Sequence, residues 1–121
     1  MLTELEKNQN EQKSDVRNKI VKELKRLKYN FSYKGTKYLV DTICIINNLK
    51  EYYDYNLEKN IYPLVAKINK TSVNNIKCNI TNATDKMCYD CDEKFLMNYL
   101  GDYKFVKPGP KKIIIAVLRR I

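Results

Sequence analysis

The chain has 121 residues, of which 44% are hydrophobic and 31% are charged, and its formal net charge is +9. This length predicts one domain with a single core, and the hydrophobic fraction excludes a chain that is disordered throughout. The longest apolar run, residues 113–118, is shorter than the roughly 18 residues of a membrane span, and the polar start does not resemble a secretory signal, so we expect a soluble, cytoplasmic, basic protein.

The N-terminal part of the chain divides at about residue 14. Residues 1–14 contain few apolar anchors and predict a flexible tail, whereas residues 15–121 are expected to form the folded domain. Ser14 is a favourable N-cap, and the first helix should run from there to about Lys28. Its apolar side consists of residues that recur at helical spacing, namely Val16, Ile20, Leu24 and Leu27.

A turn and a second helix are expected next. Residues 29–36 predict a turn, in which Gly35 is the residue free to adopt a positive φ. Residues 54–56 predict a loop. A helix is predicted between the turn and the loop, ending at about Asn47 or beyond. Its apolar residues at helical spacing are Tyr38, Leu39, Ile43, Ile46 and Leu49.

The most informative segment predicts a short helix, a break and a second helix. The short helix is expected over residues 61–68, with a proline in its first turn, where the missing N–H would be unpaired in any case. Residues 69–70 form the break, and a hydroxyl of Thr71 or Ser72 then caps a helix over about 72–86. Its apolar side is Val73, Ile76, Ile80 and Ala83, and its polar side is Asn74, Asn75, Lys77, Cys78, Thr81 and Asn82.

This arrangement is typical of a helix-turn-helix, in which the second helix enters the major groove of DNA. The polar side suits that role chemically. Asparagine can bond adenine through two hydrogen bonds, threonine can bond several bases, and lysine can reach phosphate or guanine. Two amphipathic helices joined by a turn also occur as ordinary packing, so the pattern by itself leaves both interpretations open.

The C-terminal region predicts two further elements. Apolar residues at 95–100 indicate a helix, and Gly101 follows it as a C′ residue. Residues 103–106 predict a loop or a short extended piece, and two prolines and a glycine interrupt the chain at 108–110. The β-branched run within 113–121 favours a strand by propensity. A single strand in a helical chain would have no partner, so we expect a helix there.

Basic residues gather in three segments. There are eight between residues 17 and 37 against one acid, five between 59 and 86 against one acid, and five between 107 and 120 against none. Acids gather instead at 41–58 and 85–102. Such clustering indicates a polyanionic partner, most simply nucleic acid, whereas a solubilising surface in a lysine-rich chain is the alternative.

Three stretches of the sequence share motifs with a known family. They are residues 20–43, which include the block KGTKYL at 34–39 with Thr36 in place of the family's aromatic residue, residues 61–67 (IYPLVAK) with the Thr-Ser pair that follows, and residues 100–103 (LGDY) with the Lys-Pro pair that follows. On these motifs the chain resembles, over about residues 16–121, the C-terminal DNA-binding effector domain of the stage zero sporulation protein A family. The resemblance implies an all-α bundle of about six helices, with the helix from Ser72 in the major groove.

The outer side of that helix departs from the family pattern. The family carries several arginines and a histidine there, whereas the matching positions of this chain hold Asn75, Cys78, Thr81 and Asn82, and Lys77 stands where the family has an acid. The guanine contacts of the family, and with them its target preference, therefore do not carry over. Because the matched region fills nearly the whole chain, we expect no phosphoacceptor receiver domain.

We therefore predict a DNA-binding transcriptional regulator whose partner is double-stranded DNA, bound as a homodimer or together with a related regulator protein. The alternative is a protein-interaction module that kept the fold and modulates a full-length regulator without reading bases; Tyr52, Tyr53 and Tyr55 would then mark its surface. The predicted DNA-binding residues are Lys67, Lys70, Thr71, Ser72, Asn74, Asn75, Lys77, Cys78, Thr81, Asn82, Lys111 and Lys112.

The four cysteines and the remaining residues do not predict an enzyme. Cys88 and Cys91 have the spacing of half a zinc site or of a thiol redox motif. Zinc needs four ligands and the chain has no histidine, while a redox motif would follow a strand, where a helix is expected here. We expect free thiols, no metal and no cofactor. Without a histidine, a glycine-rich phosphate loop or a nucleophile–base pair, we expect no catalysis.

Overall fold

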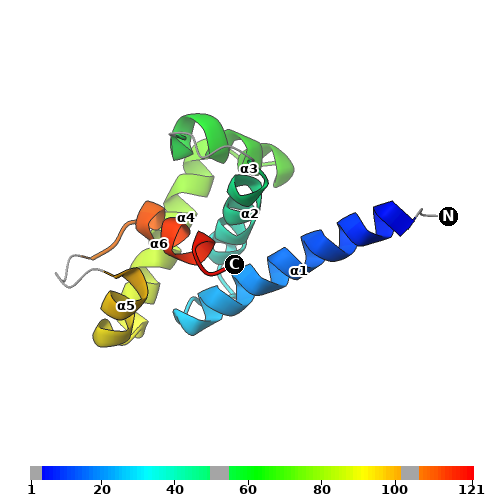
Figure 1. Ribbon diagram of the computed structural model, residues 1–121. Coiled ribbons are helices and arrows are strands. Elements are labelled where there is room, and N and C mark those ends of the chain that lie inside the picture. Colours follow the sequence, from blue (N-terminus) through cyan, green and yellow to red (C-terminus); the bar gives the residue numbers. More distant parts are fainter. Residues whose placement is uncertain (1–3, 50–54, 102–106) are drawn as a thin grey trace.

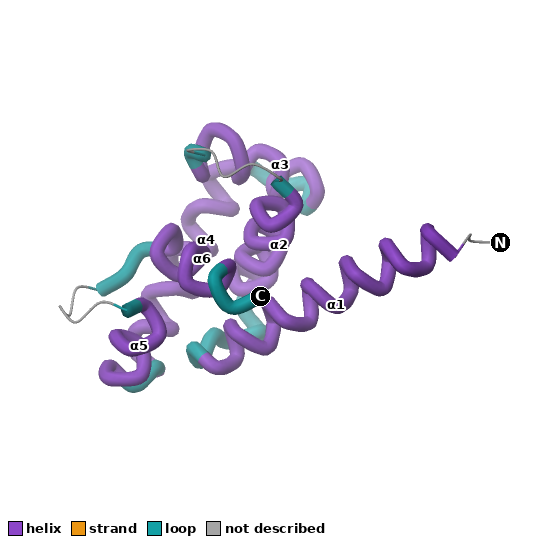
Figure 2. The backbone as a smooth tube through the Cα atoms, viewed as in Figure 1, coloured by secondary structure: helices purple, strands orange, loops and turns teal. Residues whose placement is uncertain are grey.

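The computed structural model describes residues 4–49, 55–101 and 107–121, with side chains described from residue 15 onward. These residues form six α-helices and one short π-helical turn, and no strand occurs among them (Figures 1 and 2). The predicted all-α fold of about six helices is therefore confirmed. The helices are α1 (Glu4–Arg26), α2 (Lys34–Asn48), α3 (Tyr62–Ile68), α4 (Val73–Asp90), α5 (Glu93–Leu100) and α6 (Pro110–Leu118), and the π-helical turn η1 (Leu57–Ile61) precedes α3.

The first helix starts earlier than the sequence indicated. α1 begins at Glu4, so the helix start expected at Ser14 is wrong. The segment before Ser14 is rich in Glu, Lys and Gln, which favour a helix, and it contains no Gly or Pro to interrupt one. Figure 1 shows the first half of α1 projecting away from the other helices. The second half buries Ile20 and Leu24 as expected. The division of the chain into a tail and a domain stays a prediction.

Gly35 allows α2 and α4 to approach closely. The turn expected at residues 29–36 is shorter than predicted, because α2 begins at Lys34 and Gly35 is a buried helical residue. A Cβ atom on Gly35 would lie 1.9 Å from the carbonyl oxygen of Asn79 in α4. The glycine is therefore needed for close packing and not for a positive φ. Among the described residues, positive φ values are found at Lys28 (73°), Lys70 (53°) and Gly101 (69°).

The core lies around the contact between α2 and α4, and the other helices add side chains to it. The hydroxyls of Tyr29 and Thr84 lie 2.9 Å apart inside it. No buried side-chain nitrogen or oxygen in the described part of the chain lacks a hydrogen-bond partner. The largest fully buried side chains are Ile20, Leu24, Leu27, Leu39, Ile43, Ile61, Ile76, Ile80, Met87, Leu96, Ile113 and Ile114.

A charged cluster joins α1, α5 and the C-terminal end of the chain. The buried carboxylate of Glu23 accepts hydrogen bonds from the Arg26 guanidinium at 2.9 Å and from the Tyr99 hydroxyl at 3.0 Å, and the Arg120 guanidinium lies 4.0 Å away. The same Arg120 group lies 3.7 Å from the centroid of the Tyr99 ring, which is cation–π geometry. Burial and the bond to Glu23 raise the pKa of Tyr99, so its hydroxyl stays a donor at neutral pH.

Both C-terminal helices are present as expected, although α5 begins two residues earlier than predicted and α6 begins and ends three residues earlier. α5 starts after Asp92, whose side chain caps its first turn, and ends at Gly101 with a φ of 69°. α6 begins at Pro110, and the segment expected to be a helix instead of a strand is helical to Leu118. The loop predicted at 103–106 lies outside the described residues.

Candidate nucleic-acid interface

The turn between α3 and α4 has the geometry of a helix-turn-helix. α3 carries Pro63 in its first turn, as predicted. The chain leaves α3 through Lys70, which adopts a φ of 53°, and the N–H of Thr71 donates to a carbonyl of α3 at 2.9 Å. Ser72 then caps α4, because its Oγ accepts from the N–H of Asn75 at 3.1 Å. The short helix, the break and the capped second helix are therefore confirmed.

α4 has one side in the core and the other in solvent. Ile76, Ile80 and Ala83 are buried as predicted, and the helix continues to Asp90, beyond the expected end at about residue 86. The solvent side presents amide, hydroxyl, thiol and ammonium groups, all of which can bond base edges or phosphates. We define the outer face of α4 as the exposed predicted residues Asn74, Lys77, Cys78, Thr81 and Asn82.

Asn75 differs from the other predicted base-reading residues, because its amide already has partners. Its side chain is half-buried, and its Nδ2 donates to the Thr71 hydroxyl at 2.8 Å. Its Oδ1 accepts from the Nδ2 of Asn79 at 2.8 Å. Asn75 must exchange these bonds before its amide can pair with a base.

Lys77 also has a partner on the protein. Its ammonium lies 2.7 Å from a carboxylate oxygen of Glu58 in η1, and both side chains are half-exposed. This hydrogen bond to Glu58 raises the pKa of Lys77. Lys77 is therefore charged at neutral pH, and an acid beside the outer face competes with any phosphate for it.

The remaining predicted lysines lie on two different elements. Lys67 is exposed in the last turn of α3 and Lys70 is exposed in the break that follows, shortly before α4 in the chain. Lys111 and Lys112 are exposed in the first turn of α6, and the Lys111 ammonium lies 5.7 Å from the centroid of the Tyr55 ring. The first pair continues the candidate interface, whereas the second pair stands apart from it in the chain.

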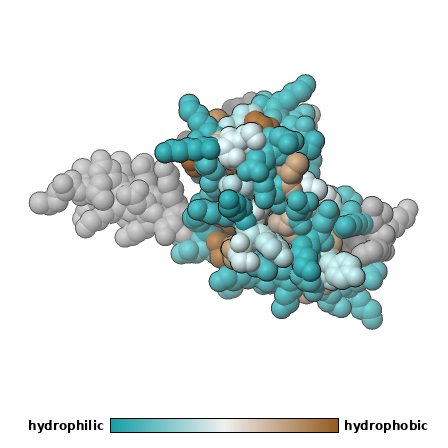
Figure 3. Space-filling model, turned by 180° about the vertical axis from the view of Figure 1, so that it is seen from behind, coloured by the Kyte–Doolittle hydropathy of each residue, from teal (hydrophilic) through white to brown (hydrophobic). Residues whose placement is uncertain are grey.

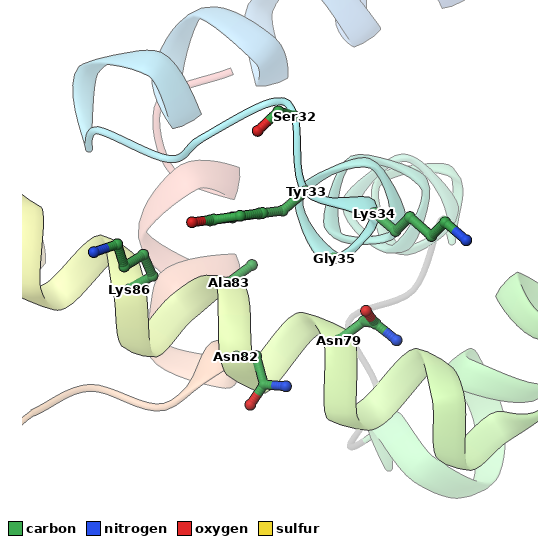
Figure 4. Close-up of a pocket in the computed structure, with 8 residues that line it drawn as sticks. All are labelled: Ser32, Tyr33, Lys34, Gly35, Asn79, Asn82, Ala83 and Lys86. Carbon is green, nitrogen blue, oxygen red and sulfur yellow. The ribbon is translucent and has the colours of Figure 1, made fainter.

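Sequence reasoning missed a group of residues beyond the predicted end of α4. Lys86 and Tyr89 are exposed, Tyr89 to 87%, and the Lys86 ammonium lies 5.8 Å from the Tyr89 ring centroid. Helical spacing places both residues on the same side of α4 as Asn82, because Lys86 follows Asn82 by four residues and Tyr89 follows Lys86 by three. Lys86 also borders a cleft of about 420 Å³ between the start of α2 and the middle of α4 (Figure 4). We name it the α2–α4 cleft; it is lined by Ser32, Tyr33, Lys34, Gly35, Asn79, Asn82, Ala83 and Lys86.

The four cysteines are free thiols in different surroundings. Burial raises the pKa of Cys44, Cys88 and Cys91, which keeps these thiols protonated and slow to react. Cys78 is exposed on the outer face of α4. In the part of the chain that the structure describes, no group of three or more Cys, Asp or Glu side chains could hold a metal ion.

Exposed apolar and aromatic side chains bear on the alternative of a protein partner. Of the tyrosines predicted to mark such a surface, Tyr52 and Tyr53 lie outside the described residues, and Tyr55 is half-buried beneath Lys111. Leu64 and Ile68 of α3 are exposed, to 47% and 63%. Figure 3 shows a mainly hydrophilic face with separate hydrophobic patches. None of the helices over the described ranges combines the length and hydropathy that crossing a bilayer requires.

One comparison with known proteins is informative. A family model described as "Sporulation initiation factor Spo0A C terminal" matches residues 20–121. This range covers the end of α1 and every later helix, including both helices of the helix-turn-helix. No curated protein matches the chain.

Proposed function

Because this chain belongs to the Spo0A C-terminal family, the DNA-binding effector domains of sporulation regulators, we propose that it is a transcriptional regulator that binds double-stranded DNA through α4. The family is one of regulatory domains and not of enzymes. The observation that carries the proposal is the outer face of α4, whose polar groups are exposed directly after a capped helix-turn-helix break. Such a helix fits the major groove.

The uncharged side chains of the outer face suit contacts with bases, and the lysines near it suit contacts with phosphates. Asn74 and Asn82 carry exposed amides that can pair with adenine, and Thr81 can contact several bases; the Oδ1 of Asn74 gives up only a long bond of 3.8 Å from the Cys78 thiol. Lys67 and Lys70 lie beside the break, where they can contact backbone phosphates. With no arginine on this face, the phosphate term dominates affinity, and binding weakens steeply as salt rises.

A gel-shift assay against a promoter pool at two salt concentrations tests the proposal. We expect duplex binding that falls as salt is raised. Asn74→Ala and Asn75→Ala should relax sequence preference, and the loss with Asn75→Ala should be smaller because its amide is held by Thr71 and Asn79. Lys67→Ala should weaken all sequences alike. Absence of duplex binding by the unaltered chain at low salt would contradict the proposal.

Alkylation of Cys78 locates the bound face directly. The thiol of Cys78 is exposed on the outer face, so a maleimide reagent should reach it readily in the free protein. Bound duplex should slow this reaction. Cys44 supplies the internal control, because it lies on α2 and its half-buried thiol should react at the same slow rate with or without DNA. Equal Cys78 rates in both samples would place DNA on another face.

The alternative function is a protein-interaction module that modulates a full-length regulator. Exposure of Leu64 and Ile68 on α3 favours it, since two apolar side chains four residues apart form one small patch. On this hypothesis the double substitution Leu64→Ser with Ile68→Ser abolishes copurification with a regulator. Neither the unaltered chain nor the double variant binds duplex DNA. Retained duplex binding by the same variant favours the DNA-binding function. A homodimer on DNA would appear as a second shifted band.

A further inference from the structure

We propose that the α2–α4 cleft holds a stretch of the phosphodiester backbone of the DNA that α4 binds. The inference rests on the proposed function and extends it to residues that neither the helix-turn-helix nor the outer face includes. It gives α4 a second contact with the same duplex. The cleft would add affinity and fix the position of the protein without reading sequence.

The charges of the cleft suit a polyanion. Its lining contains two lysines, Lys34 and Lys86, and no acid. Lys34 forms no ion pair with any residue that the structure describes. The ammonium of Lys86 lies 3.9 Å from a carboxylate oxygen of Asp90, and both side chains are half-exposed. A pair this long and this exposed contributes little, so a phosphate can replace Asp90.

The shape of the cleft suits a chain of charges and not a single small anion. In Figure 4 the ring of Tyr33 extends across the space between α2 and α4, while Lys34 and Lys86 extend in opposite directions from it. Because the two ammonium groups point away from one another in Figure 4, their directions suit separate phosphates of one strand better than a single phosphate. The Tyr33 ring, which is 40% exposed, then faces the sugar between them.

The cleft is continuous with the outer face of α4. Asn82 belongs to both, since it is exposed on the outer face and also lines the cleft. Lys86 follows Asn82 by one helical turn, and Gly35 places the start of α2 against the same part of α4. A duplex seated on the outer face therefore brings one of its backbones to the mouth of the cleft.

Salt titration of duplex binding tests this inference. The slope of log K against log salt counts phosphate contacts, at about 0.9 per contact on B-DNA. We expect Lys34→Ala with Lys86→Ala to reduce the slope by about two and to weaken binding roughly tenfold at 0.1 M salt. Lys34→Arg with Lys86→Arg should restore both, because the cations return. The probe is a duplex of about 25 base pairs with random sequence.

The matched control is Lys22→Ala with Lys94→Ala, which removes two exposed lysines from α1 and α5 and makes the same change in net charge. For this control variant, the slope of log K against log salt should stay close to that of the unaltered chain. Equal slopes for the two double variants would overturn the cleft assignment while the DNA-binding function stands. No duplex binding by the unaltered chain at 50 mM salt would overturn both. Circular dichroism verifies that each variant remains helical.

Discussion

The edge of the helical bundle and the outer side of α4 use different basic residues. Three of the four arginines are paired with acids at the edge of the bundle, and their own side chains remain partly exposed: Arg26 and Arg120 lie around Glu23, and Arg17 lies 2.9 Å from Asp41. The basic residues along the outer side of α4 are lysines. The planar guanidinium suits fixed contacts and ring stacking, whereas the ammonium is a point charge on a flexible stem.

This difference explains why the net charge of +9 is better evidence for affinity to DNA than for recognition of a particular base sequence. Arginine is the side chain that recognises guanine through two hydrogen bonds, and here it stabilises the fold. On the proposed function, the exposed lysines would supply phosphate contacts that do not depend on sequence. Base preference would then depend on the uncharged groups of the outer face, chiefly the amides of Asn74 and Asn82.

The largest effect is expected where the interior and α4 meet, at Gly35. Gly35→Ala would place a Cβ 1.9 Å from the carbonyl oxygen of Asn79, so α4 must shift. We expect a loss of about 3 kcal/mol in the free energy of unfolding from this overpacking, measured by urea denaturation, although alanine favours a helix more than glycine does. Duplex binding should weaken too, because the outer face moves with α4.

The matched control for this change is Gly109→Ala. Among the described residues, the two chain neighbours apart, no atom lies within 4 Å of a Cβ at that position, and its backbone needs no positive φ. Gly109 is the N-cap of α6, where alanine is less favourable than glycine, so the free energy of unfolding should fall by less than about 1 kcal/mol. Equal effects of the two substitutions would show that the close contact of α2 with α4 is not needed for stability.

The second effect separates stability from binding. Glu23→Gln leaves Arg26 and Arg120 without their shared anion, and the Tyr99 hydroxyl bonds a weaker acceptor. We expect a loss of about 2 kcal/mol in the free energy of unfolding, less than for a fully buried pair because Arg26 is half-exposed. Urea denaturation measures it, and the folded variant should bind duplex as the unaltered chain does.

The control for Glu23→Gln is Asp15→Asn, which breaks an exposed pair with Lys19 at 3.3 Å on the same helix. That change should cost less than about 0.5 kcal/mol. A loss of duplex affinity in Glu23→Gln under conditions where it is fully folded would break the distinction between structural arginines and binding lysines.

The third effect tests whether arginine and lysine are interchangeable beside the buried carboxylate of Glu23. Arg120→Lys keeps the charge near Glu23 but replaces the planar group that lies 3.7 Å from the Tyr99 ring centroid. We expect a loss of about 1 kcal/mol, measured by thermal denaturation. The reverse exchange on the surface, Lys86→Arg, should leave stability unchanged. An Arg120→Lys variant as stable as the unaltered chain would show that charge alone suffices.

The sequence was sufficient for features that depend on neighbours along the chain. The spacing of Ile76, Ile80 and Ala83 predicts which side of α4 is buried, and the hydroxyl of Ser72 predicts where the helix starts. Pro63 and Gly101 likewise mark a helix start and a helix end by local backbone geometry. The helix-turn-helix and most of the outer face follow from these signals.

Features that depend on contacts between distant segments were not predictable. Gly35 looked like a turn residue because its closeness to Asn79 exists only after α2 and α4 pack. The pair of Lys77 with Glu58, nineteen positions apart, has no signal in helical spacing. The extension of α1 to Glu4 rests on helix propensity alone, since that segment has no apolar side to reveal it.

The smallest effect concerns the Lys77–Glu58 pair, where the outer face itself contains an anchored cation. Glu58→Gln removes an acid 2.7 Å from the ammonium of Lys77 and leaves that ammonium free for phosphate. Duplex affinity should rise a few-fold at low salt and the gain should shrink as salt screens the charge. Asp85→Asn is the control. Asp85 lies on the same helix as Lys77 and is paired with Lys107 at 3.4 Å, so this substitution makes the same charge change next to a different lysine. If the two gains are equal, only net charge matters; a larger gain for Glu58→Gln shows that Lys77 contacts the DNA and that its tie to η1 restrains binding.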